Sequence, residues 1–288
     1  MKKNTPFFLL FPALIVLLVL CIVPLGGSVY LSLQDRDLRT PKELNFVGSS
    51  NYLELLHDPR FWNSLKVSFS YMGLVTFSSI IVGLTLTYLC TEFKGKTKAV
   101  ILMLFLLPFM IPRVSAAIIW RFMFFPIFGI FSYFLRLFHI PPIAFFASPM
   151  PAFFAISIVD MWQWAPFIAV LLVSSIDFLP REVVDSAELD CSKFQKFRYV
   201  ILPLLKPTIF FLILIKILES MRAFDLIYNI TKGGPGTATE TLDMYAFYRG
   251  VLWSGEISYA SAMSVVMLVI TIVLMNLIWK VAKKWVTF

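Results

Sequence analysis

REVVDSAELDCSKFQKFRYVILP, residues 181–203, is a charged stretch set between long apolar runs. Pro180 suits the first turn of a helix, where its missing N–H costs nothing, and this predicts a helix over 181–190. Ser192 and Gln195 have the spacing of a capping box, which predicts that a second helix begins there. The stretch is therefore predicted to be a helix–turn–helix with an apolar edge and charged flanks.

The composition around this stretch indicates a membrane protein. Hydrophobic residues make up 59% of the 288 residues, charged residues only 15%, and the mean hydropathy is +0.83. Soluble domains carry about a quarter charged residues. In a membrane protein, the net charge of +8 indicates basic cytoplasmic loops rather than nucleic-acid binding. The scattered Cys21, Cys90 and Cys191 indicate neither a disulfide framework nor a zinc site.

Six apolar segments are long enough to cross a membrane as helices. They lie at about 7–33, 64–91, 98–125, 150–176, 204–230 and 258–284. The first is interpreted as an uncleaved span, and the whole chain, 1–288, as a single transmembrane domain. Basic residues favour a cytoplasmic location for both termini. The fold class is thus all-α, with six spans and a cytoplasmic loop at about 177–203 between helices four and five.

Polar residues inside apolar spans are functional candidates, because ionised groups are costly in a membrane. The predicted substrate-binding residues are Asp160, Gln163, Trp164, Glu219, Arg222, Asp225 and Asn229. Carboxylates and amides accept hydroxyl protons, and tryptophan rings stack on sugars. Two other interpretations stay open: Lys216, Glu219 and Arg222 neutralise one another or pair with Asp160, or the cations hold an acidic substrate.

Several segments carry a family resemblance. LPREVVDSAELDCSKFQKFRYVILPLLKP, residues 179–207, resembles the EAA loop of bacterial ABC-importer permeases, with Cys191 where glycine is usual. The segments IPRVSAAIIWRFMFFPIFGIFSYFL, WQWAPF, FDLIYNITKGGPGTATETL and YASAMSV resemble the carbohydrate-importer branch related to the maltose permease. The resemblance covers nearly the whole chain.

The resemblance implies a permease of the bacterial cytoplasmic membrane that forms half of a translocation pathway for a carbohydrate. The implied partners are a second homologous permease, two ATPase subunits that bind ATP and Mg²⁺, membrane lipid, and an extracellular or periplasmic binding protein. The residues expected to dock the ATPase are Glu182, Asp185, Ser186, Ala187, Asp190, Cys191, Phe194 and Phe197.

No catalytic function is expected for this chain. The sequence has no G-x-x-x-x-G-K-[ST] phosphate loop, and its only histidines are His57 and His139. We therefore expect no cofactor, no metal and no nucleic acid bound to it. A self-contained secondary transporter or channel is the alternative, although no inverted repeat is visible. A membrane-bound enzyme is a third class, which the missing catalytic cluster disfavours.

Overall fold

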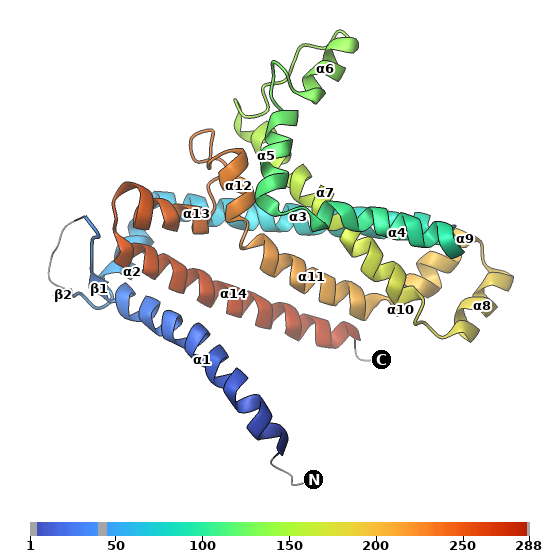
Figure 1. Cartoon of the computed structure of the whole chain (residues 1–288), viewed down its shortest axis with the longest axis horizontal. Helices are drawn as coiled ribbons and strands as arrows, with labels where there is room; N and C mark the ends of the chain where they lie inside the picture. Colours follow the sequence, from blue (N-terminus) through green and yellow to red (C-terminus); the bar gives the residue numbers. More distant parts are fainter. Residues whose placement is uncertain (1–4, 40–44, 287–288) are drawn as a thin grey trace. The chain divides into compact units, whose positions relative to one another are not determined.

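The computed structural model describes residues 5–39 and 45–286, most of which are helical (Figure 1). The elements in chain order are α1 (Thr5–Ser32), β1 (Gln34–Asp35), β2 (Asn45–Phe46), α2 (Ser50–His57), α3 (Pro59–Cys90), α4 (Gly95–Met110), α5 (Arg113–Met123), α6 (Ile130–Leu137), α7 (Pro149–Ile176), α8 (Arg181–Asp190), α9 (Lys193–Lys196), the π-helical turn η1 (Phe197–Ile201), α10 (Leu202–Leu204), α11 (Lys206–Ser220), α12 (Phe224–Ile230), α13 (Leu242–Phe247), the π-helical turn η2 (Tyr248–Trp253) and α14 (Ile257–Val286). The two short strands pair antiparallel, with Gln34 opposite Phe46 and Asp35 opposite Asn45.

Four helical segments are long and apolar enough to cross a membrane: Leu10–Ser32 in α1, all of α3, all of α7, and Ile257–Val281 in α14. Two more segments meet the same criteria as bent pairs: α4 with α5, bent by 90°, and Lys193–Leu204 with α11, bent by 69°. If each bent pair crosses once, the described residues provide six spans. The prediction of an all-α membrane protein is confirmed, and the cytoplasmic location of both termini stays a prediction.

The predicted third span, 98–125, is broken at Pro112. Proline has no N–H to donate, and it drives the residue before it out of the helical conformation. Ile111 is accordingly extended, with φ −73° and ψ 126°, and α5 begins at Arg113 in a new direction. The bend leaves carbonyl groups at the end of α4 without helical donors, and these need partners from elsewhere in the protein.

The predicted fifth span, 204–230, is also discontinuous. Helix α11 ends in a tighter turn, in which the N–H of Arg222 donates to the carbonyl of Glu219 at 3.1 Å. Helix α12 begins beyond this turn. Arg222 therefore does not continue the α11 face that carries Lys216 and Glu219, because the helix ends at Ser220.

One compact unit combines the described residues of the segments 1–62 and 242–270. In it, the carboxylate of Asp58 accepts hydrogen bonds from the hydroxyl of Tyr245 at 2.5 Å and from that of Tyr259 at 2.7 Å. The guanidinium of Arg60 lies 4.4 Å from the ring centre of Trp253. These contacts link the start of α3 to α13, η2 and α14.

The Asp58 cluster predicts that this unit loses stability in acid. Burial opposes ionisation of the carboxyl group, but hydrogen bonds from Tyr245, Tyr259 and backbone N–H groups outweigh it and hold the pKa of Asp58 below its usual value. This contribution is present above the unfolded-state pKa of about 3.9 and is lost as the pH falls through the lower folded-state pKa. We expect Asp58→Asn to lower the melting temperature at pH 7 and to make it less dependent on pH below about 4. Thermal unfolding in detergent measures both, with Glu54→Gln as control, and an unchanged acid profile in Asp58→Asn would contradict the prediction.

The other compact unit combines the described residues of 63–241 and 271–288. Helix α7 is central to it, because it contacts α4, α5, α11 and α12 (Figure 1). Helix α3 approaches α7 at Gly83, where a Cβ atom would lie 2.6 Å from a side-chain atom of Ile168. Glycine at this position therefore permits the close packing that buries Ile168 in an apolar cluster shared by α3, α7 and α11.

Candidate functional site

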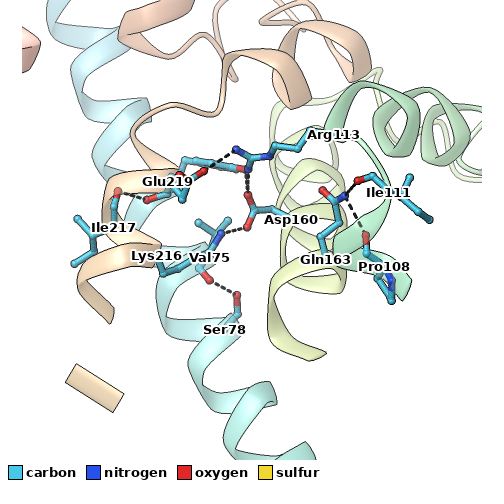
Figure 2. Close-up of polar contacts among 12 residues, drawn as sticks. Val75, Ser78, Pro108, Ile111, Arg113, Asp160, Gln163, Lys216, Ile217 and Glu219 are labelled. Carbon is cyan, nitrogen blue, oxygen red and sulfur yellow. Dashed lines mark hydrogen bonds and ion pairs between the residues drawn. The ribbon is translucent and has the colours of Figure 1, made fainter. Parts of the chain in front are cut away.

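The candidate site is built around Asp160, a carboxylate in the apolar helix α7, whose side chain has no solvent exposure. Its Oδ2 atom accepts hydrogen bonds from the hydroxyl of Tyr71 at 2.9 Å and from Nη2 of Arg113 at 2.8 Å. Its Oδ1 atom forms an ion pair with Nζ of Lys216. Figure 2 shows Asp160 between Arg113 and Lys216. Helices α3, α5, α7 and α11 thus each place one polar side chain at this point.

The formal charges of this network balance. Lys216 is as deeply buried as Asp160, and its Nζ lies 4.7 Å from the ring centre of Trp164. Arg113 also reaches Glu219, with 3.8 Å between Nη1 and Oε2. Two cations therefore face two carboxylates, the arrangement in which ionised groups persist away from water.

Gln163 ties α7 to the break between α4 and α5. Its Nε2 atom donates to the carbonyl oxygens of Pro108 at 3.3 Å and Ile111 at 3.0 Å (Figure 2). The side-chain amide thereby replaces helical donors that are lost at the bend. Gln163 lies about one helical turn after Asp160, so this contact holds the break beside the buried carboxylate and brings Arg113, the first residue of α5, within its reach.

The network has a buried end and an open end. The side chains of Asp160 and Lys216 are fully buried, whereas 22% of the Arg113 side chain and 40% of the Glu219 side chain are exposed. Within the described part of the chain, Nε of Arg113 and Oε1 of Gln163 are buried without a hydrogen-bond partner. A molecule that binds here therefore meets Arg113 and Glu219 first, and Asp160 orients Arg113 from behind.

The other three predicted substrate residues do not join this hydrogen-bond network. Arg222 is exposed in the turn between α11 and α12, and it has no ion-pair partner among the residues that the structure describes. Asp225 is exposed, and its backbone carbonyl accepts a hydrogen bond from Nδ2 of Asn229 at 2.7 Å. Substrate binding by these three residues stays a prediction.

Sequence reasoning did not single out two members of the network, Arg113 and Tyr71. Arg113 could have been found, because it is an ionisable residue inside a predicted span, directly after the breaking Pro112. Tyr71 carries no such signal, since a tyrosine in an apolar helix is ordinary. Only the fold brings its hydroxyl to Asp160.

The charged stretch folds as predicted. Helix α8 spans 181–190, and the capping box begins α9: the N–H of Gln195 donates to Oγ of Ser192 at 3.4 Å, and the N–H of Ser192 donates to Oε1 of Gln195 at 2.9 Å. Cys191 joins the two helices with φ −117° and ψ 143°, an extended conformation open to any residue. Cysteine can therefore stand where glycine is usual, because this turn needs no positive φ.

The predicted docking residues divide by their exposure. Glu182, Asp185, Ser186 and Phe194 are exposed, and Ala187 and Cys191 are partly exposed. Phe197 is instead buried in the apolar cluster shared with α3 and α7, and the side chain of Asp190 lies outside the described residues. Lys193 forms an ion pair with Glu92, which follows α3. Phe197 and Lys193 thus anchor the loop, and the exposed residues of α8 are the part open to a partner.

Relatives of the chain are membrane components of transport systems. The chain is 32% identical over 267 residues to the trehalose/maltose transport system permease protein MalF of Thermococcus litoralis, an alignment that covers 92% of this chain and 89% of that protein. It is 30% identical over 260 residues to the sulfoquinovosyl glycerol transport system permease protein SmoG of Agrobacterium fabrum, covering 90% and 84%.

A solved structure shares the fold. A chain of a bacterial ABC transporter involved in the import of the acidic polysaccharide alginate superposes with a TM-score of 0.85 at 19% identity, covering 99% of this chain and 98% of that one. Residues 79–287, which include the charged stretch 181–203 and Asp160, match the model of a protein family. The chain therefore belongs to the family of binding-protein-dependent transport system inner membrane components.

Proposed function

We propose that this multi-pass membrane protein is one permease subunit of an ATP-driven ABC importer for a carbohydrate. Family membership supports the class of transporter, and the names of the relatives include trehalose, maltose and sulfoquinovosyl glycerol. The buried Asp160 network, whose open end is formed by Arg113 and Glu219, supports the proposed location of the sugar site. A channel or secondary transporter has no comparable use for the folded α8–α9 loop.

The open end of the network has the groups that a sugar needs. The carboxylate of Glu219 accepts hydrogen bonds from hydroxyl groups, and the guanidinium of Arg113 donates to hydroxyl and ring oxygens. Trp164 is less available for stacking on a sugar, because it is buried with Lys216 over its ring.

The charge balance of the network favours a neutral sugar over an acidic one. Both cations, Arg113 and Lys216, already face carboxylates, so the four ionised groups sum to zero. An acidic substrate would leave Glu219 facing a like charge, which is unfavourable in a poorly solvated site. Arg222 is the exposed cation nearby in sequence that an acidic sugar would have to recruit.

The proposed partners are a second permease, two ATPase subunits that bind ATP and Mg²⁺, and an extracellular binding protein that delivers the sugar. One structural neighbour was solved in complex with an alginate pentasaccharide-bound periplasmic protein, which supports the last of these. The exposed residues of α8 would meet an ATPase subunit, and α9 and η1 would pass its movement to α11. This route follows the continuous chain from α8 to the helix that holds Lys216 and Glu219.

Glu219→Gln is expected to lower sugar uptake by about 10-fold or more while the complex still assembles. The change keeps the shape of the side chain but removes a charged acceptor, and a hydrogen bond to a charged group contributes about 1.5–3 kcal/mol. Uptake of radiolabelled maltose or trehalose into cells measures the effect, with subunit co-purification as the assembly readout. Glu54→Gln is the matched control, since Glu54 is exposed and lies outside the network. Full uptake in Glu219→Gln would remove Glu219 from the substrate site.

A further inference from the structure

An apolar groove of about 490 Å³ lies where the charged stretch joins α11. Its walls come from η1, α10 and α11, and its lining includes Arg198, Tyr199, Lys206, Ile209, Phe210 and Ile213. The last four of these residues follow the i, i+3, i+4, i+7 spacing and so share one face of α11. The apolar part extends about 10 Å beyond Lys206 along the helix, at a rise of 1.5 Å per residue.

Two cations stand at the end of this groove where α11 begins. Arg198 and Lys206 are both exposed, and neither has an ion-pair partner in the part of the chain that the structure describes. The guanidinium of Arg198 lies 6.0 Å from the ring centre of Tyr199, which is also exposed. The groove is therefore apolar along α11, and at its end near Lys206 it carries two cations and an exposed tyrosine.

We propose that this groove binds an anionic phospholipid. The phosphate would lie between Arg198 and Lys206, Tyr199 would lie at headgroup depth, and an acyl chain would follow Ile209, Phe210 and Ile213. Basic pockets beside membrane helices select anionic headgroups, and tyrosine is enriched at the membrane interface. A soluble anion would contact the two cations but leave the apolar part of the groove empty. An apolar protein segment would fill the apolar part but leave both cations without a counter-charge. The groove also lies at a junction between a charged loop and an apolar helix, which is where lipid headgroups are found.

Such a lipid would stabilise the bend between α10 and α11, through which we propose that movement of α8 and α9 reaches α11. The groove residues belong to η1, α10 and α11, which include the 69° bend at the start of α11. A lipid that contacts both sides of the bend favours one angle over others, so anionic lipid is expected to change how strongly the partner ATPase responds to substrate. This effect is separate from the sugar site, because none of the groove residues belongs to the Asp160 network.

Native mass spectrometry of the purified full-length chain tests the proposal, with dioleoyl phosphatidylglycerol and dioleoyl phosphatidylcholine as probes. We expect phosphatidylglycerol to bind more tightly than phosphatidylcholine. We expect Arg198→Gln/Lys206→Gln to weaken phosphatidylglycerol binding about 30-fold, since each basic group near the surface contributes about 1 kcal/mol. The control Lys94→Gln/Lys96→Gln removes the same charge from exposed residues outside the groove. An unchanged melting temperature shows that each variant is folded.

Three outcomes would overturn the proposal. Equal phosphatidylglycerol binding in the groove variant and the control variant would show that the cations do not hold the lipid. Displacement by glycerophosphoglycerol, which lacks acyl chains, at concentrations comparable to those of the lipid would indicate a site for a soluble phosphate. Loss of lipid binding once the partner subunits are added would show that the groove belongs to a subunit interface.

Discussion

Asp160→Asn is expected to be the most destabilising single change in the buried network. Among residues 5–39 and 45–286, the Asp160 carboxylate forms an ion pair with the Lys216 ammonium, which otherwise lies against the Trp164 ring, and the same carboxylate also binds Arg113. Its removal leaves a buried cation without a counter-charge, which costs about 3–5 kcal/mol. Lys216→Met should cost less, because Asp160 keeps its bonds to Arg113 and Tyr71. Thermal or denaturant unfolding in detergent measures both effects.

The double variant Asp160→Asn/Lys216→Met tests whether the cost of Asp160→Asn comes from the unpaired Lys216. It removes both members of the buried pair and leaves Arg113 facing Glu219, so it should recover much of the stability lost in Asp160→Asn alone. Asp177→Asn is the control, because Asp177 is an exposed residue at the end of α7 whose pair with Lys98 contributes about 1 kcal/mol or less. Additive losses in the double variant would mean that the pair does not act as a unit.

Asp185→Lys and Ala187→Trp in α8 are each expected to abolish ATPase co-purification or its stimulation by substrate. Asp185 is exposed, so it can meet basic or N–H groups of a partner, and reversal of its charge replaces attraction with repulsion. Ala187 is small and partly exposed, and a tryptophan there would overpack a close contact between helices. Membrane insertion should be unaffected, because α8 is not one of the candidate spans.

Controls for α8 come from exposed residues elsewhere. Asp35→Lys applies the same charge reversal to β1, and Ala144→Trp adds the same bulk to an exposed loop. Both should co-purify with ATPase as the unaltered chain does. If Asp185→Lys and Ala187→Trp also retain ATPase and full uptake, the charged stretch is only a solvated loop.

Local features of this chain could be predicted from the sequence. The α8 bounds and the capping box of Ser192 and Gln195 were predictable, because a proline or a cap acts on the residues next to it. The six apolar segments were predictable from length alone, but their breaks were not. Pro112 marks the place where α4 can end, but the hydrogen bonds that the amide of Gln163, 51 positions away in sequence, donates at the bend could not be read from the local pattern.

The rest of the site could not be predicted, because it depends on contacts between residues that lie far apart in the sequence. The pairing of Asp160 with Lys216 was one of the interpretations that the sequence left open, but the role of Arg113 depends on the direction of α5 after the break. Arg222 is separated from Lys216 and Glu219 because α11 ends at Ser220, and no proline or glycine at this point predicts the end of the helix. Such features follow from packing between helices and not from the local pattern.

The central claim is that this chain conducts a carbohydrate only when a separate ATPase drives it. Proteoliposomes that contain the chain with its second permease, ATPase subunits and binding protein test it directly, with radiolabelled maltose and trehalose as probes. We predict uptake that requires ATP and Mg²⁺ on the ATPase side and stops when this chain is omitted, while the chain alone neither hydrolyses ATP nor transports sugar. Sugar transport by the chain alone, driven by a sugar or proton gradient without ATP, would contradict the account and identify a secondary transporter or channel.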